Sequence, residues 1–146
     1  MKKYFLFLGG IVMITSGFIL TSSAPSPEQA GEFIIEHEND IAVKQPGPHE
    51  GGGYTTAFSF FSKAKGLNLV FRKRILHPGS SIGYHAQEAD EIYYILSGTG
   101  ELNMNDDTIR VSAGDAILTR PGNSHGLRPV GNEDLTILIS YEQDPD

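Results

Sequence analysis

Hydrophobic residues of this chain gather in short extended runs that turn residues separate. The runs are rich in aromatic and β-branched side chains, and they are TTAFSFF (55–61), LNLVFRKRIL (67–76), SIGYH (81–85), EIYYILS (91–97), GELNM (100–104), DTIRV (107–111), DAILTR (115–120) and LTILISY (135–141). Turn residues fill the intervals, as in HPGSS, SGTG and RPGNS, and NDD between GELNM and TIRV predicts a tight hairpin. Beyond residue 24, no segment has the period of an amphipathic helix. The pattern predicts an all-β fold, a small antiparallel β-barrel or sandwich.

The beginning of the chain has a different pattern. Lys2 and Lys3 precede a continuous apolar run, YFLFLGGIVMITSGFIL (4–20), and the small polar residues TSSA follow it. This layout is typical of a secretory signal peptide, so we expect residues 1–24 to be removed on export to the periplasm or the outside of the cell. The alternative is an uncleaved membrane anchor, because the run approaches the length that spans a bilayer.

The next segment divides the chain further. Residues 25–53 are rich in Pro, Gly, Glu and Gln, with one apolar run at Phe33–Ile35, and we interpret them as a linker that carries an edge strand. Residues 54–146 then form the predicted barrel domain. The chain contains no cysteine, so the exported domain has neither a lipid-attachment site nor a disulfide, and its core alone must stabilise it.

The charge of the chain argues against nucleic acid as a partner, and its one basic cluster has two interpretations. The formal net charge is −7, and loss of Lys2 and Lys3 with the signal peptide would make it −9. Such a chain is a poor partner for nucleic acid. Its one basic cluster is Arg72, Lys73 and Arg74, in which the two arginines share a face if the segment is a strand. The cluster is either a solvated face, or one arginine points into the barrel and pairs with an anionic group of a substrate.

A candidate metal site stands out in the segment GSSIGYHAQEADEIYYILSG. Residues two apart in a strand face the same way, so His85 and Gln87 share a side. We expect a bend at residues 88–90 to fold the next run back antiparallel, which would bring the Glu91 carboxylate beside them. A second block, GDAILTRPGNSHGL, adds His125 after a Pro-Gly turn. Two histidines and one carboxylate leave open positions on a transition metal.

The first block resembles the first motif of the cupin superfamily. That motif is a glycine, five residues, H-x-H, three or four residues, E, six residues and G. Gly79, His85, Glu91 and Gly98 match it at those spacings, and Gln87 stands where the second histidine would be. Its amide oxygen is either a direct ligand or a hydrogen-bond partner of a metal-bound water.

The second block resembles the second cupin motif, a glycine, five residues, P-x-G, two residues and H. Gly114, Gly122 and His125 match, whereas Arg120 replaces the first proline and Pro129 stands where an asparagine often follows. The resemblance covers roughly residues 66–141 and is closest to small single-domain bacterial cupins. It implies a jelly-roll, or double-stranded β-helix, and a homodimer.

Two further residues are candidates for catalysis. Tyr93 shares the face of Glu91, so it could line the pocket as a donor or an acid, or else be a core aromatic. Arg120 could flank the mouth of the pocket, or only cap an exposed edge. The histidines and Glu91 could instead be ordinary core or surface residues, but their match to the motif spacing favours metal ligation.

The predicted chemistry follows from these ligands. One divalent ion, zinc, manganese, iron or nickel, held by His85, Gln87, Glu91 and His125 would keep a net positive charge. It would favour a small oxygenated ligand such as a sugar, a uronate, or a hydroxy- or keto-acid. Lewis-acid isomerisation or elimination is the favoured reaction. The alternatives are a non-haem iron dioxygenase, which uses the same two-histidine, one-carboxylate set, and a non-catalytic module that binds a sugar or another small ligand.

Overall fold

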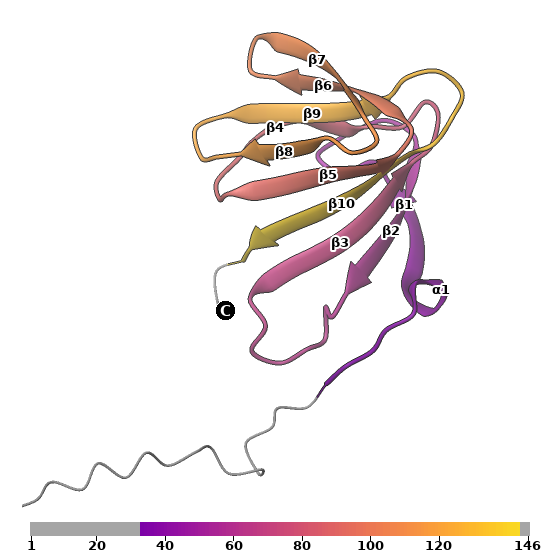
Figure 1. Ribbon diagram of the computed structural model, residues 1–146, viewed down its shortest axis with the longest axis vertical. Helices are drawn as coiled ribbons and strands as arrows, with labels where there is room; N and C mark the ends of the chain where they lie inside the picture. The colour runs from indigo at the N-terminus through magenta and orange to yellow at the C-terminus, as the bar shows by residue number, and fades with distance from the viewer. Residues whose placement is uncertain (1–32, 144–146) are drawn as a thin grey trace, which may run out of the picture. The chain divides into compact units, whose positions relative to one another are not determined.

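The computed structural model describes residues 33–143, which form two antiparallel β-sheets and one short helix (Figure 1). The elements are α1 (Glu38–Ile41), β1 (Ala42–Pro46), β2 (Tyr54–Phe60), β3 (Leu69–Leu76), β4 (Ile82–Ala86), β5 (Glu91–Ser97), β6 (Thr99–Met104), β7 (Asp107–Ser112), β8 (Ala116–Thr119), β9 (Ser124–Pro129) and β10 (Leu135–Glu142). The predicted signal peptide, residues 1–24, lies outside the described residues. No helix in the described part of the chain is long and apolar enough to span a membrane.

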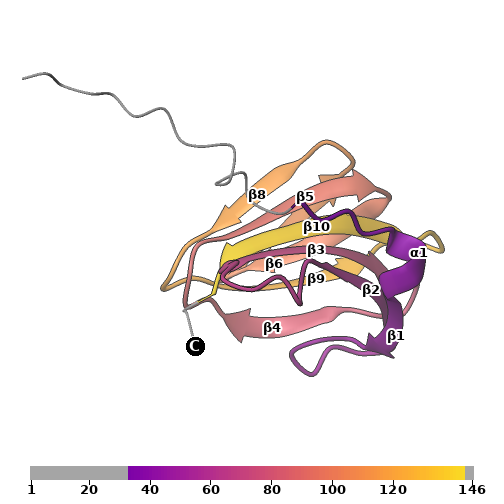
Figure 2. The same ribbon diagram turned by 90° about the horizontal axis from the view of Figure 1, so that it is seen from below.

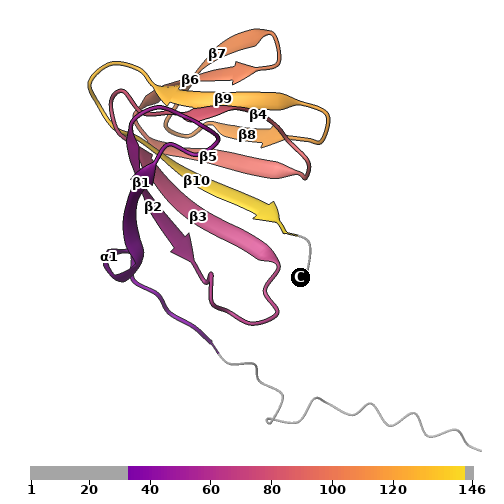
Figure 3. The same ribbon diagram turned by 180° about the vertical axis from the view of Figure 1, so that it is seen from behind.

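The strands confirm the predicted all-β class but not a closed barrel. One sheet has six strands in the order β1-β2-β3-β10-β5-β8, and the other has four in the order β4-β9-β6-β7. Figures 1 and 3 show the strands of the larger sheet fanned out beside one another. Strand pairing does not join the two sheets within residues 33–143. The arrangement is a sandwich whose sheets enclose a shared interior.

An edge strand occurs within the segment interpreted as a linker. It is β1, at Ala42–Pro46, and it pairs antiparallel with β2. The apolar run Phe33–Ile35 has no regular secondary structure and is exposed. In this pair of strands, Gln45 of β1 is opposite Thr55 of β2, and Lys44 is opposite Thr56.

Alternation along the central strands builds the core. In the first five residues of β5 and of β10 every second residue is buried, because these strands have one face toward the interior and one away from it. The buried hydrophobic cluster consists of Leu76, Ile82, Tyr93, Ile95, Leu102, Val111, Leu127, Leu135, Ile137 and Ile139. This cluster lies between the sheets. At one end of this cluster, the residues that face the interior are polar.

The bend at residues 88–90 differs from the prediction. We expected it to pair the strand of Glu91 with the strand of His85, but β4 pairs with β9, and β5 pairs with β10 and β8. The bend carries the chain from the smaller sheet to the larger one. Glu91 therefore reaches the two histidines across the interior and not along a shared ladder.

Candidate metal centre

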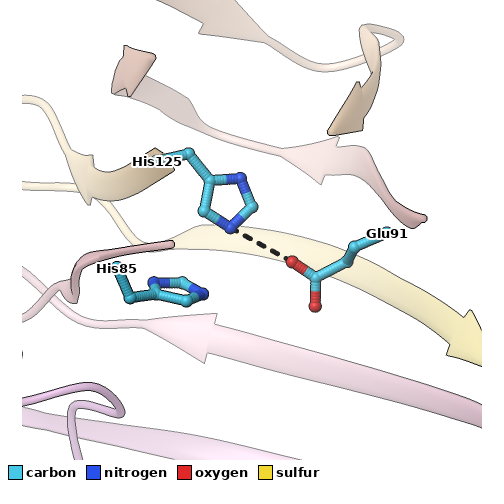
Figure 4. A group of neighbouring side chains, drawn as sticks. All are labelled: His85, Glu91 and His125. Carbon is cyan, nitrogen blue, oxygen red and sulfur yellow. Dashed lines mark ion pairs between the residues drawn. The ribbon is translucent and has the colours of Figure 1, made fainter. Parts of the chain in front are cut away.

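Three potential ligands converge from three strands at one end of the interior (Figure 4). His85 on β4 and His125 on β9 are directly opposite each other in the smaller sheet. Glu91 begins β5 in the larger sheet. One ligand atom from each residue lies within 4.8 Å of the others, and Glu91 Oε2 is 3.1 Å from His125 Nε2. The group could hold an ion.

Hydrogen bonds orient both imidazoles toward the centre of this group. His125 is fully buried, and its Nδ1 lies 2.8 Å from the hydroxyl of Thr119. His85 Nδ1 lies 2.8 Å from the carbonyl oxygen of Gly83, to which only an N–H can donate. When Nδ1 carries the hydrogen in each ring, the Nε2 lone pair is available to a metal.

Glu91 provides the test of whether a metal fits this group. Glu91 is 7% exposed, and its Oε2 has no hydrogen-bond partner within the described residues apart from the nearby His125 Nε2. When His125 carries its hydrogen on Nδ1, its Nε2 cannot donate to this oxygen, and a buried carboxylate oxygen without a donor is costly. Two neutral imidazole nitrogens and this oxygen are ligands that zinc, manganese, iron and nickel accept. The residues therefore fit a divalent ion.

Tyr93 lies directly beneath the group. Its hydroxyl is 3.5 Å from His125 Nε2, and the two rings stack at a centroid distance of 5.0 Å. Burial raises the pKa of Tyr93 well above its ordinary value, and the charge of Glu91 and a hydrogen bond to it raise that pKa further. The protein environment therefore favours the protonated phenol, which can donate a hydrogen bond.

Gln87 and Arg120 differ in their relation to the group. Gln87 lines a cavity of about 560 Å³ that opens beside the candidate ligands, and its backbone N–H donates to the carbonyl of Asn123. Its role as a direct ligand stays a prediction. Arg120 is exposed in the turn before β9 and is not among the residues that line this cavity. Its role at the mouth of the pocket also stays a prediction.

Sequence reasoning missed His49. This residue belongs to the loop between β1 and β2, and its ring stacks flat on His85 at 3.5 Å with an interplanar angle of 2°. Burial lowers the pKa of His49, and the nearby His85 lowers it further. His49 also lines the cavity. A histidine in the Gly- and Pro-rich segment PGPHEGGG matches no metal-site spacing, so only its position in space reveals the contact.

The loop of His49 is held against β4 (Figure 2). The N–H of Gly83 donates to the carbonyl of Pro48, and the N–H of Ser81 donates to the carbonyl of Gly52. A Cβ at Gly83 would overlap the backbone oxygen of His49. The absence of a side chain there lets the two backbones approach closely, and this approach positions the ring of His49 on His85.

Thr119→Val is expected to weaken metal binding without removing a ligand. Thr119 is opposite Glu91 in the β5–β8 ladder, and valine would keep its volume but lose the hydroxyl that contacts Nδ1 of His125. Loss of such an outer hydrogen bond typically costs roughly 10- to 100-fold in metal affinity. Competition with a calibrated chelator would measure the change. An unchanged affinity would mean that Thr119 does not hold the ring.

Comparisons with known proteins bear on this arrangement. Residues 73–141 match the family described as "Cupin domain". An oxalate-binding protein of Thermotoga maritima is 43% identical over 70 residues, which are 47% of this chain and 58% of that protein. A 5-nitrosalicylic acid 1,2-dioxygenase of a Bradyrhizobium species is 23% identical over 69 residues, 47% of this chain and 33% of that protein. The chain thus spans less than two thirds of the length of these curated relatives.

A solved structure extends the likeness. A predicted oxalate decarboxylase of Thermotoga maritima superposes with a TM-score of 0.69 and 31% sequence identity. The match covers 75% of this chain and 99% of that one. The likeness therefore includes nearly the whole domain of the other protein.

Proposed function

Because this chain belongs to the cupin superfamily, we propose that it holds one divalent metal at His85, Glu91 and His125 and acts there on a small oxygenated acid. The observation that carries the proposal is the convergence of two imidazoles and the buried Glu91 carboxylate, whose ligand atoms lie within 4.8 Å of one another. A positive ion would compensate the carboxylate that the fold has removed from water.

Each residue around the proposed ion would have its own role. A bound divalent metal would supply Lewis acidity and a net positive charge after Glu91 is counted. Gly83 and Thr119 fix the imidazoles that face it. Tyr93 keeps its proton and offers a hydrogen bond at the floor of the site. Gln87 and Tyr141 line the cavity through which a small molecule would enter.

The proposed ligand is an acid that a metal can chelate, such as a hydroxy-acid, a keto-acid, a uronate or a dicarboxylate. The relative named an oxalate-binding protein supports an acid over a neutral sugar. Isomerisation or elimination is the proposed reaction, because both start from a carbonyl or carboxylate that a metal polarises.

Metal analysis followed by ligand titration tests this function. We expect protein purified without a histidine tag to contain about one divalent ion per chain, and calorimetry to detect oxalate binding that disappears when the metal is removed. Restored protein would then be screened for metal-dependent isomerisation or elimination of hydroxy- and keto-acids. Oxalate binding that persists without metal would contradict the proposal.

Two specific observations favour alternative functions. The name of the oxalate-binding relative favours a module that binds an acid without turnover, and this module would show metal-dependent binding in the same titration but no product. The two-histidine, one-carboxylate set and the dioxygenase relative favour an oxygenase. An oxygenase would consume oxygen when loaded with ferrous iron, whereas the proposed Lewis-acid chemistry requires no oxygen.

Gln87→His distinguishes the two roles of residue 87. If the Gln87 amide is a direct ligand, histidine should raise affinity for zinc and change the visible spectrum of the cobalt-substituted protein, because a stronger ligand enters the coordination sphere. If Gln87 only holds a water molecule, affinity should stay nearly constant. Gln87→Ala is the matched variant, and an identical cobalt spectrum in all three proteins would exclude direct ligation.

A further inference from the structure

Two arginines of β3 face the interior from the sheet that also carries Glu91, one row or more inward of the residues that line the cavity. Arg72 and Arg74 alternate with Lys73 on β3, and their partners on β10 are the core residues Ile139 and Ile137. Ile139 in turn is opposite Tyr93 on β5. Arg72 therefore belongs to the same cross-sheet row as Tyr93, one row inward from Glu91.

Arg74 is fixed and almost fully buried. It is 1% exposed, and its Nη1 donates to Thr55 Oγ1 at 2.7 Å. With its oxygen toward the guanidinium, the Gln45 amide accepts from Nη1 and Nη2 at 2.8 and 2.9 Å. The buried Nε has no partner among the described residues. Only neutral groups hold this charge.

Arg72 is partly buried beside it, and its Nε donates to the hydroxyl of Ser59 at 3.1 Å. No carboxylate of residues 33–143 lies within ion-pair distance of either arginine. Burial lowers the pKa of Arg74, and the charge of Arg72 lowers it further. The interior thus contains two neighbouring positive charges without compensation, which is costly unless an anion pairs with them.

We propose that Arg72 binds a second anionic group of the ligand, a carboxylate or a phosphate, while the metal centre chelates the first. This inference rests on the function proposed above and narrows its substrate to acids that carry two anionic groups. The row that joins Arg72 to Tyr93 spans two strand spacings, or about 10 Å between backbones. An arginine side chain and an acid of three or four carbons together bridge such a separation.

Arg74 supports this contact through its charge. Because Thr55 and Gln45 hold its guanidinium, it stays in place and adds positive potential at the position of Arg72. Lys73, the cation between them, does not contribute in the same way. It faces the outside of the sheet, where its ammonium pairs with Glu38 at 2.6 Å. Lys73 therefore provides a control for the general effect of charge.

The test compares three acids on cobalt-loaded protein, whose visible spectrum reports occupancy of the metal centre. Lactate offers only an α-hydroxy acid. Malate adds a carboxylate at the third carbon, and 3-phosphoglycerate adds a phosphate there. We expect wild-type protein to prefer malate or 3-phosphoglycerate over lactate, and Arg72→Gln to weaken binding of the preferred acid by about 10- to 100-fold, as expected for a lost charge-assisted hydrogen bond. The lactate affinity and the cobalt content of Arg72→Gln should stay within about twofold of the wild-type values.

The controls separate this role from others. Lys73→Gln removes one positive charge from the outer face and should change none of the three affinities. Arg72→Lys should restore part of the preference. Preference for malate would identify the second group as a carboxylate, and preference for 3-phosphoglycerate would identify it as a phosphate. Equal affinities of wild-type protein for all three acids, or an equal loss in Lys73→Gln, would overturn the assignment of Arg72 while the metal-dependent function stands. Failure of the protein to bind cobalt or lactate would overturn both.

Discussion

His125→Ala is expected to lose metal binding almost completely. His125 is fully buried, and it is the residue that links the other parts of the site, since it contacts Glu91, Thr119 and Tyr93. Removal of a direct ligand should lower metal affinity by more than about 100-fold, beyond the range for outer-shell changes. Metal content after dialysis against a buffered metal solution would measure the effect, with about one ion per chain expected for the wild type.

His85→Ala should behave in the same way, because His85 supplies the ligand opposite His125 in the ladder. His77→Ala is the matched control. His77 is a surface histidine whose Nδ1 is 2.9 Å from Asp134, and it takes no part in the candidate site. Wild-type metal content in both His85→Ala and His125→Ala would refute the proposed centre.

Gly83→Ala is expected to have the largest effect on stability. A Cβ at this position would meet the backbone oxygen of His49, and backbone cannot move away as a flexible side chain can. Such overpacking typically costs about 1–3 kcal/mol in the free energy of unfolding, and we expect a value at the upper end. Denaturant unfolding monitored by circular dichroism would measure it.

The control for this variant lies in the loop that packs against Gly83. A Cβ at Gly52 would meet nothing closer than 3.6 Å, so Gly52→Ala should change stability by no more than about 0.5 kcal/mol. Gly83→Ala should also separate His49 from His85, since the stacking depends on the contact between the loop and β4. Equal stability of both variants would show that the loop yields without cost.

Much of the fold could be predicted from the sequence. The aromatic and β-branched residues of EIYYILS and LTILISY, between turn residues, predicted strands, and β5 and β10 occupy these segments. The turn residues NDD predicted a tight hairpin, and β6 and β7 pair from Met104 to Asp107 around it. These features are local, because a strand face and a two-residue turn depend only on neighbouring residues.

The pairing of strands could not be predicted in the same way. The short bend after β4 is compatible with a hairpin, which we expected, and with a crossing between sheets, which the structure has. The length and composition of residues 88–90 fit both paths. The choice depends on strands far along the chain, because β9 pairs with β4 while β10 and β8 occupy both edges of β5.

The sequence by itself determined which chemistry the chain offers, since the spacing of His85, Glu91 and His125 placed two imidazoles and a carboxylate in register with known motifs. Only the tertiary structure decided what surrounds that chemistry. It put His49 on His85, Thr119 behind His125, and the uncompensated charges of Arg72 and Arg74 in the interior. The physical reason is that the direction of a side chain follows from strand period, whereas its burial and its partners depend on which distant backbone packs against it.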